Sequence, residues 1–358
     1  HGVRQALPGE FSFRAVRNGK MTLNQAQAVA DLIAASNDGA VSLALEKMSG
    51  TQNKMIQDLA EGLRQIAVLG EAGIDFADQD IEEVSLPALR KQLERIKTTL
   101  ERLAISYERG VRLQEGVSVA FVGLPNAGKS SFFNALLGED RSIVSEIAGT
   151  TRDVVRERIT LRGRRSTLSL KFEDTAGLRS TEDTIEKIGI ERSQRAAREA
   201  DLILFLVDPL SDPEQVHAEW ARLGRPRQKT LGFLTKTDLS NSTHLANAQA
   251  LLNSLQLPLG IQTSAKTGGG IQEAIDAIVD FSEKWTARTP GEVLLTRLDQ
   301  LSNVEAALSH LNRAFGAPEI ELFAADVRQA LHSLAPLIGE TPVDDILGKI
   351  FSDFCIGK

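Results

Sequence analysis

Apolar residues recur every three or four positions through the first third of the chain, which is the period of an amphipathic helix. A short helix is predicted from Leu23 through Ile33, and a third helix follows Pro87 and is predicted to end at Gly110, because glycine commonly terminates helices. Between them, one long helix is predicted to carry a single apolar stripe of Leu45, Met48, Met55, Leu59, Leu63 and Ile66. Each stripe needs an apolar partner.

The same spacing returns near the end of the chain, at Leu294, Leu298, Leu301, Leu308, Leu311 and Phe315. Two further amphipathic segments then run to Phe351. Since helices on both sides of the middle region need partners, the economical interpretation is one helical domain that is split in sequence by an inserted domain. Two separate helical hairpins that never meet are the alternative.

The middle region, from Val117 to about Lys284, alternates strand-like and helix-like segments. Its candidate strands are Val117–Val122, Val154–Leu161, Leu168–Phe172, Leu202–Val207, Thr230–Leu234 and a short one before Thr263. This alternation is typical of an α/β domain with a largely parallel sheet, whose ligands bind at the carboxyl ends of the strands. The predicted fold class is therefore an α/β domain inserted into an all-α helical domain.

Composition and charge limit the partners and the cell compartment that fit this chain. The chain has 358 residues and a formal net charge of −7, so a nucleic-acid partner must be held by a local basic surface or by shape. The single cysteine excludes an internal disulfide and fits a reducing compartment, and the apolar runs are too short to cross a bilayer. We expect a cytoplasmic protein.

The chemistry centres on Gly123-Leu-Pro-Asn-Ala-Gly-Lys-Ser130, which lies between a predicted strand and a predicted helix. That order is typical of a phosphate-binding P-loop, and it makes the domain a P-loop domain. Glycines let backbone N–H groups wrap closely around phosphates, Lys129 can reach the β and γ oxygens, and the Ser130 hydroxyl can bind Mg²⁺. The predicted nucleotide contacts here are Gly123, Asn126, Ala127, Gly128, Lys129, Ser130 and Ser131.

Two later motifs favour GTP over ATP. Asp174-Thr-Ala-Gly177 follows a predicted strand and supplies an acid for the Mg²⁺ shell and a glycine N–H for the γ-phosphate. Thr235-Lys236-Thr-Asp238 is similar to the Asn-Lys-x-Asp guanine motif, with threonine in place of asparagine. The Asp238 carboxylate can accept hydrogen bonds from guanine N1–H and N2–H₂, which adenine does not offer. The matching final loop is predicted at Ser264, Ala265 and Lys266. We expect a GTP-binding G domain.

These patterns alone do not identify the residue that activates the attacking water. A Ras-like GTPase places glutamine after Asp-x-x-Gly, whereas this chain has Leu178, which cannot orient water. The nearby candidates are Arg179, Glu182, Asp183 and Glu186, each of which also reads as an ordinary solvated charge. Arg152 and Arg179 could also stabilise transition-state charge.

The chain resembles the MnmE family of tRNA-modification GTPases, also called TrmE, along essentially its whole length. The matching segments are Pro8–Phe11, Gly123–Ser130, Ile147–Asp153, Asp174–Arg179, Ile188–Arg192 and the terminal Phe354-Cys-Ile-Gly-Lys358. The resemblance implies four segments: a remnant of a folate-binding domain at 1–20, helical parts at 21–115 and 287–358, and the G domain at 116–286.

The resemblance also implies site roles. Potassium would be held by Asn126 with Ser145, Ile147 and Thr150, and magnesium by Ser130 and Thr151. Glu186 matches the glutamate that acts through water on the nucleophile, so the implied catalytic residues are Glu186, Asn126 and Thr151.

The implied output is a homodimeric, potassium-activated GTPase that binds GTP and GDP. With a flavin-dependent partner protein, it would install an aminomethyl-type substituent on C5 of the wobble uridine of tRNA. A folate one-carbon donor is implicated for complete family proteins, but its domain is expected to be largely absent here. The resemblance implies that Cys355 takes part in the modification. The alternative, equally supported by the sequence, is that Cys355 is a small apolar residue that packs a C-terminal helix.

Two other functions compete with this one. The first is a GTP-dependent RNA-binding switch in ribosome assembly, although such relatives more often carry a discrete RNA-binding domain after the G domain. The second is a nucleotide-bound scaffold that never hydrolyses GTP.

Overall fold

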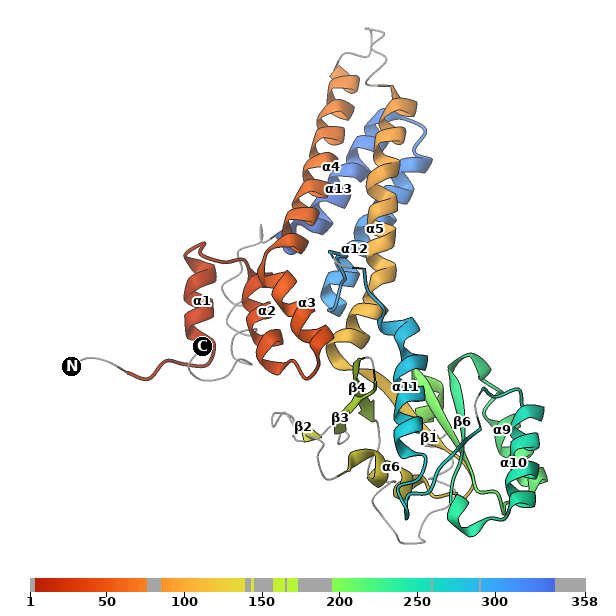
Figure 1. Ribbon diagram of the computed structural model, residues 1–358. Coiled ribbons are helices and arrows are strands. Elements are labelled where there is room, and N and C mark those ends of the chain that lie inside the picture. Colours follow the sequence, from red (N-terminus) through yellow and green to blue (C-terminus); the bar gives the residue numbers. More distant parts are fainter. Residues whose placement is uncertain are drawn as a thin grey trace. The chain divides into compact units, whose positions relative to one another are not determined.

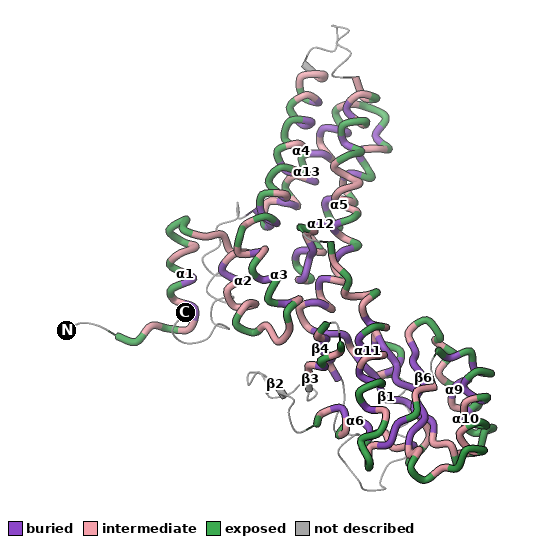
Figure 2. The backbone as a smooth tube through the Cα atoms, viewed as in Figure 1, coloured by how far each residue is buried: buried purple, intermediate pink, exposed green. Residues whose placement is uncertain are grey.

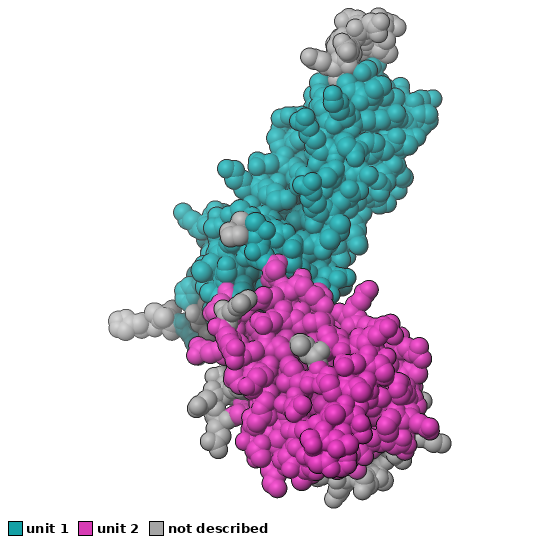
Figure 3. Space-filling view, turned by 45° about the vertical axis from the view of Figure 1, so that its right-hand side comes forward, with its two compact units in different colours: residues 1–35, 39–114, 288–358 teal, residues 36–38, 115–287 magenta. Residues whose placement is uncertain are grey.

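The structure is a computed structural model that describes residues 4–75, 85–138, 143–144, 157–164, 166–172, 195–258, 260–289 and 291–338. The chain divides into two compact units, which Figure 3 shows in different colours. Unit 1 contains residues 1–35, 39–114 and 288–358, and unit 2 contains residues 36–38 and 115–287. The chain therefore leaves unit 1, forms unit 2 and returns.

Unit 1 is helical in its described parts (Figure 1). Its helices are α1 (Glu10–Arg17), α2 (Leu23–Ala34), α3 (Asp38–Met48), α4 (Thr51–Asp75), α5 (Leu86–Glu115), α12 (Leu298–Gly316) and α13 (Ile320–Ile338). Within the described parts of the chain, no helix combines the length and apolar character that a bilayer crossing requires.

One apolar core joins the helices that precede unit 2 to those that follow it. Fully buried side chains of α4 and α5, such as Leu63 and Leu93, belong to the same cluster as Leu311 of α12 and Phe323 of α13. The purple stretches of these helices in Figure 2 are this core. The two flanking helical regions thus form one unit, and the alternative of two hairpins that never meet is wrong.

Two predicted helix ends differ from the structure, and glycine is the reason in both cases. The long helix predicted across Leu45 to Ile66 is two helices, because Gly50 adopts φ = 81° between α3 and α4. Gly110 does not end α5, which continues to Glu115. A Cβ at Gly110 would lie 1.9 Å from the carbonyl oxygen of Leu295, so this glycine permits α5 to approach the segment that leads into α12 closely.

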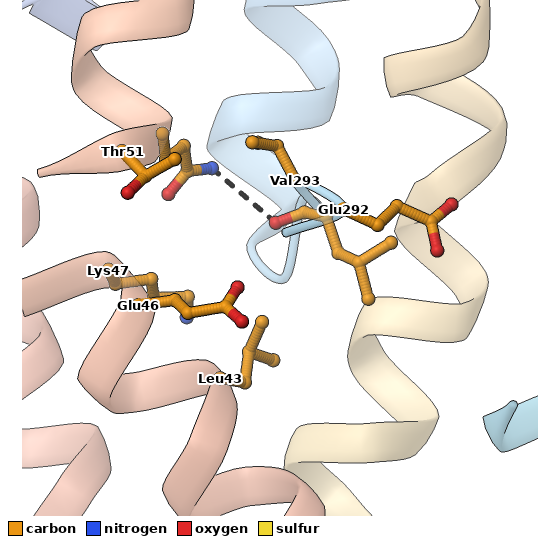
Figure 4. Close-up of a pocket in the computed structure, with 8 residues that line it drawn as sticks. Leu43, Glu46, Lys47, Thr51, Glu292 and Val293 are labelled. Carbon is orange, nitrogen blue, oxygen red and sulfur yellow. Dashed lines mark hydrogen bonds between the residues drawn. The ribbon is translucent and has the colours of Figure 1, made fainter. Parts of the chain in front are cut away.

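A buried ammonium group holds the segments of unit 1 where the chain leaves and re-enters it. The Nζ of Lys47 donates to Asp31 Oδ2 (2.8 Å), Gln114 Oε1 (3.0 Å) and Thr296 Oγ1 (2.6 Å). Burial lowers the pKa of Lys47, and the Asp31 carboxylate opposes that effect. Figure 4 shows the small pocket beside this network, lined by Lys47 and the neighbouring Gln52, whose Nε2 donates to the Leu294 carbonyl.

Unit 2 is built on a seven-stranded sheet among its described residues. Its strands are β1 (Val117–Val122), β2 (Ile143–Val144), β3 (Glu157–Arg162), β4 (Thr167–Phe172), β5 (Leu202–Val207), β6 (Thr230–Leu234) and β7 (Ile261–Gln262), in the order β2-β3-β4-β1-β5-β6-β7. Strands β4, β1, β5, β6 and β7 are parallel, and β3 is antiparallel to both of its neighbours.

Alternating apolar residues bury both faces of the sheet (Figures 1 and 2). In β5, Leu202, Leu204 and Leu206 pack with α6 (Lys129–Leu137) and α11 (Ile271–Thr286), while the residues between them pack with α9 (Pro213–Arg222) and α10 (Ser242–Ser254). The unit therefore has three layers, α/β/α. The predicted fold class is confirmed.

The antiparallel edge of the sheet was predicted incompletely. The strand predicted at Val154–Leu161 lies at Glu157–Arg162 where it is described, and β2 was not predicted because two residues carry no periodicity. Strands β3 and β4 form a hairpin with a short connection, which allows antiparallel pairing and leaves no room for a crossover helix.

We expect Lys47→Met to lower the free energy of unfolding of unit 1 by about 3 kcal/mol, because it leaves the largely buried Asp31 carboxylate without its cation. Urea unfolding followed by circular dichroism measures this effect. The control is Lys54→Met, which removes an exposed lysine of α4. Equal stability of the two variants would contradict this role for Lys47.

Candidate functional site

The loop between β1 and α6 has the backbone that a P-loop requires. Asn126 and Gly128 both adopt left-handed conformations, with φ = 60° and φ = 82°. A Cβ at Gly123 would lie 2.3 Å from the carbonyl oxygen of Leu206 in β5, so only glycine fits there. The loop therefore begins pressed against the sheet and ends at the start of α6, where the N-cap Gly128 offers no side chain to cap the first N–H groups of the helix.

The predicted phosphate-binding side chains lie at the start of α6. Lys129 is partly buried, and its Nζ donates to the carbonyl oxygens of Gly123 (3.0 Å) and Leu124 (2.9 Å). Burial lowers the pKa of Lys129. Ser130 is partly buried and Ser131 is exposed on the first turn of the helix. The loop and its lysine thus form one bonded unit, with the ammonium group directed into the loop.

The loop that follows β6 is tied directly to the P-loop. The Thr235 hydroxyl donates to the carbonyl oxygen of Ala127 at 2.8 Å, and both residues are buried. Lys236 adopts φ = 52°, its Nζ lies 3.0 Å from Asp208 Oδ2, and its Cε lies 3.8 Å from the position of a Cβ on Gly128. The Lys236 chain therefore lies along the P-loop, and Asp208 anchors its end.

The Asp238 carboxylate is oriented by the next loop. The Ser264 hydroxyl donates to Asp238 Oδ1 at 2.6 Å and accepts from the backbone N–H of Thr267 at 3.2 Å. The Thr237 N–H also donates to the carbonyl oxygen of Thr263 at 3.2 Å. Ser264 is buried, while Ala265 is partly exposed and Lys266 is exposed. Asp238 thus has one oxygen fixed by Ser264.

These loops meet at one edge of the sheet because each follows the carboxyl end of a parallel strand. The P-loop follows β1, Thr235–Asp238 follows β6, and Ser264 follows β7. The site places backbone N–H groups and an ammonium group near one end and an oriented carboxylate near the other. That arrangement can bind the phosphates and the base of one nucleotide.

Asp208 was missed by the sequence reasoning. It follows β5 at the same edge of the sheet, and this acid after a buried strand was the available signal. The remaining predicted site residues lie outside the described residues, so their positions are not part of this geometry; they are Ser145, Ile147, Thr150, Thr151, Asp174, Gly177, Glu186 and Cys355. The same holds for Arg152, Leu178, Arg179, Glu182 and Asp183.

Comparison with known proteins identifies the family of this chain. The model of the MnmE helical domain matches residues 23–355. The tRNA modification GTPase MnmE of Neisseria meningitidis serogroup B is 39% identical over 100% of this chain and 78% of its own length. The chain belongs to the MnmE family. The MnmE proteins of Pectobacterium atrosepticum and Acetivibrio thermocellus are 40% and 34% identical, over 78% and 77% of their own lengths.

Membership in the MnmE family confirms the resemblance identified from the sequence motifs. It also confirms the expectation of a GTPase, since the matching relatives carry that name. The helical-domain match begins before unit 2 and ends after it, as the single helical core of unit 1 requires.

We expect Thr235→Val to weaken GTP binding by up to about tenfold. The valine is similar in shape but cannot donate to Ala127, and a buried carbonyl without its donor costs on the order of 1 kcal/mol. Isothermal titration with GTP measures the change. Thr235→Ser keeps the hydroxyl and is expected to bind GTP within about twofold of the original chain. Unchanged affinity in the valine variant would show that the bond does not support the site.

Proposed function

We propose that this chain hydrolyses GTP as a potassium-activated, dimerising switch in the modification of the wobble uridine of tRNA. The observation that carries the proposal is the bond from Thr235 to Ala127, which joins a P-loop to a carboxylate suited to guanine. Membership in a family whose named relatives are tRNA modification GTPases supports the substrate.

The β and γ phosphates would lie over the P-loop. Gly123, Ala127 and Gly128 supply closely approaching backbone, and Ser130 and Ser131 stand where the N-terminal N–H groups of α6 can bind an anion. Lys129 would exchange its bonds to the loop carbonyls for bonds to phosphate oxygens. The negative phosphates would stabilise the charged ammonium group and so oppose the lowering of the Lys129 pKa by burial. Asp174 and Gly177 are proposed to complete this end of the site.

Guanine would be recognised by Asp238. Its carboxylate accepts from N1–H and N2–H₂, and the bond from Ser264 keeps one of its oxygens in place. The alkyl chain of Lys236 would cover one face of the base, while backbone at Ala265 and Lys266 would approach the base from the final loop. Adenine has neither the N1–H nor the N2–H₂ donor, so ATP would bind weakly.

The metal ligands proposed for this site are oxygen donors, which fit both ions. Ser130 with Thr151 would hold Mg²⁺, and Asn126 with Ser145, Ile147 and Thr150 would hold K⁺. The left-handed, exposed position of Asn126 supports the second set, because it places this amide at the surface of the P-loop. A bound K⁺ would supply positive charge beside the β and γ phosphates.

Water activation is assigned to Glu186, because Leu178 occupies the position where Ras-like GTPases carry glutamine. Glu186 would act through a second water on the attacking one. The switch is proposed to be a homodimer in which two G domains close on GTP and relax after hydrolysis, ordering Thr151 and Glu186.

The output is proposed to be an aminomethyl-type substituent on C5 of the wobble uridine, made with a flavin-dependent partner protein in the cytoplasm. Cys355 is proposed to take part in that modification.

We expect GTP turnover by this chain to be at least about tenfold faster in potassium than in sodium at equal ionic strength, because positive charge beside the transferred phosphate lowers the barrier. Steady-state phosphate release measures the rates. Asn126→Ala is expected to remove the preference and leave GTP affinity largely intact. Equal turnover in both ions would contradict the potassium site and favour a switch of the ribosome-assembly type.

We expect Glu186→Ala to slow hydrolysis by on the order of 10²-fold while sparing GTP binding, which is the usual range for loss of a general base. Single-turnover hydrolysis and nucleotide titration separate the two effects. Glu182→Ala removes a nearby acid and serves as the control. Normal turnover in the Glu186 variant would remove this residue from the mechanism, and no turnover in the original chain would favour the scaffold.

A further inference from the structure

Positive charge is concentrated beside the amino ends of the parallel strands of unit 2, at the end of the sheet opposite the nucleotide loops. From Trp220 to Thr237 the sequence contains five cations and no acid. Four of these cations lie in Arg222–Lys229, the segment that leads into the amino end of β6. This local surface stands out in a chain whose net charge is −7.

Hydrogen bonds bring cations from two other segments to this place. The Nζ of Lys229 donates to the carbonyl oxygens of Arg198 (2.9 Å) and Ala200 (2.7 Å), just before β5. The Nζ of Lys284, in the last turn of α11, donates to the carbonyl oxygen of Gln228 (2.9 Å). We call the resulting surface the basic edge, and its members are Arg198, Arg225, Arg227, Lys229 and Lys284.

Within the part of the chain that the structure describes, none of the five cations of the basic edge forms an ion pair. Among the acids beside it, Glu199 pairs with Arg195 and Glu219 with Arg222. The Asp201 carboxylate accepts from the N–H and hydroxyl of Ser118 and also attracts Lys229. Arg198, Arg225, Arg227 and Lys284 are exposed, so their charge faces solvent.

The backbone beneath the arginines is preset. Gly224 and Arg225 are both left-handed, with φ = 76° and φ = 56°, and an arginine rarely adopts this conformation without support. The N–H of Arg227 donates to the carbonyl oxygen of Arg225 at 2.8 Å, and Pro226 stiffens the turn between them. Lys284 is held against the rings of Phe281 and Trp285, 3.6 and 4.4 Å from their centroids. The charges are therefore presented from an ordered surface.

We propose that the basic edge binds the phosphate backbone of the RNA substrate. Exposed guanidinium and ammonium groups spread over three segments fit a polymer of regularly spaced phosphates, and they position such a polymer without reading its bases. The inference rests on the proposed role in tRNA modification. It assigns RNA contact to the end of unit 2 that the nucleotide does not use.

The test is equilibrium binding of an unmodified tRNA transcript to the full chain over a series of salt concentrations, using Arg198→Gln/Arg225→Gln/Arg227→Gln. Lys229 and Lys284 are kept because they donate to backbone carbonyls. We expect the triple variant to bind at least about tenfold more weakly and to lose roughly two units of the log–log salt slope. GTP turnover is expected to be unchanged.

The matched control is Lys54→Gln/Lys91→Gln/Arg95→Gln, which removes the same charge from exposed positions of unit 1. It is expected to keep the original salt slope. Unchanged tRNA binding by the basic-edge variant would overturn the inference while leaving the proposed function in place. If the basic-edge variant loses binding to phosphatidylglycerol vesicles but keeps tRNA binding, the RNA inference is overturned in favour of contact with a membrane surface. Failure of the original chain to bind tRNA, with GTP hydrolysis intact, would overturn both the inference and the tRNA role.

Discussion

The hydrogen bond from the Thr235 hydroxyl to the Ala127 carbonyl oxygen joins two loops that are 108 residues apart in the sequence. A nucleotide is recognised only if the loops for its phosphates and for its base keep a fixed separation. The parallel strands β1 and β6 bring the loops to one edge, and the bond sets their fine alignment. Ser264 extends the same chain of contacts to Asp238, so the P-loop and the Thr235–Asp238 loop form one continuous unit.

The insertion of unit 2 into unit 1 adds a second constraint, because the chain must leave the helical core of unit 1 and return to it. The core of unit 1 combines helices from both sides of the insertion. Lys47 meets that constraint locally, since its ammonium group holds Gln114, the last residue before unit 2, and Thr296, which lies shortly after it. A lysine buried for this purpose is stable only because Asp31 offsets its charge.

Short motifs with strict chemistry could be predicted from the sequence, and long-range packing could not. The P-loop and the Thr235–Asp238 loop each depend on a few adjacent residues and on the strand before them. The role of Gly110 depends on the Leu295 carbonyl, nearly two hundred residues away, so the sequence favoured the commoner role of a helix end. The partners of Lys47 are similarly scattered, at separations of 16, 67 and 249 residues, and no local pattern marks them.

The most direct test of this account is the rate of hydrolysis of GTP and of ATP by the full chain, at equal concentrations in potassium and magnesium. Two hydrogen bonds from guanine to a charged group are worth enough to predict a preference for GTP of about 10²-fold or more. Turnover of GTP with little turnover of ATP would support the site as assembled by Thr235, Asp238 and Ser264. Equal turnover of the two nucleotides would contradict it.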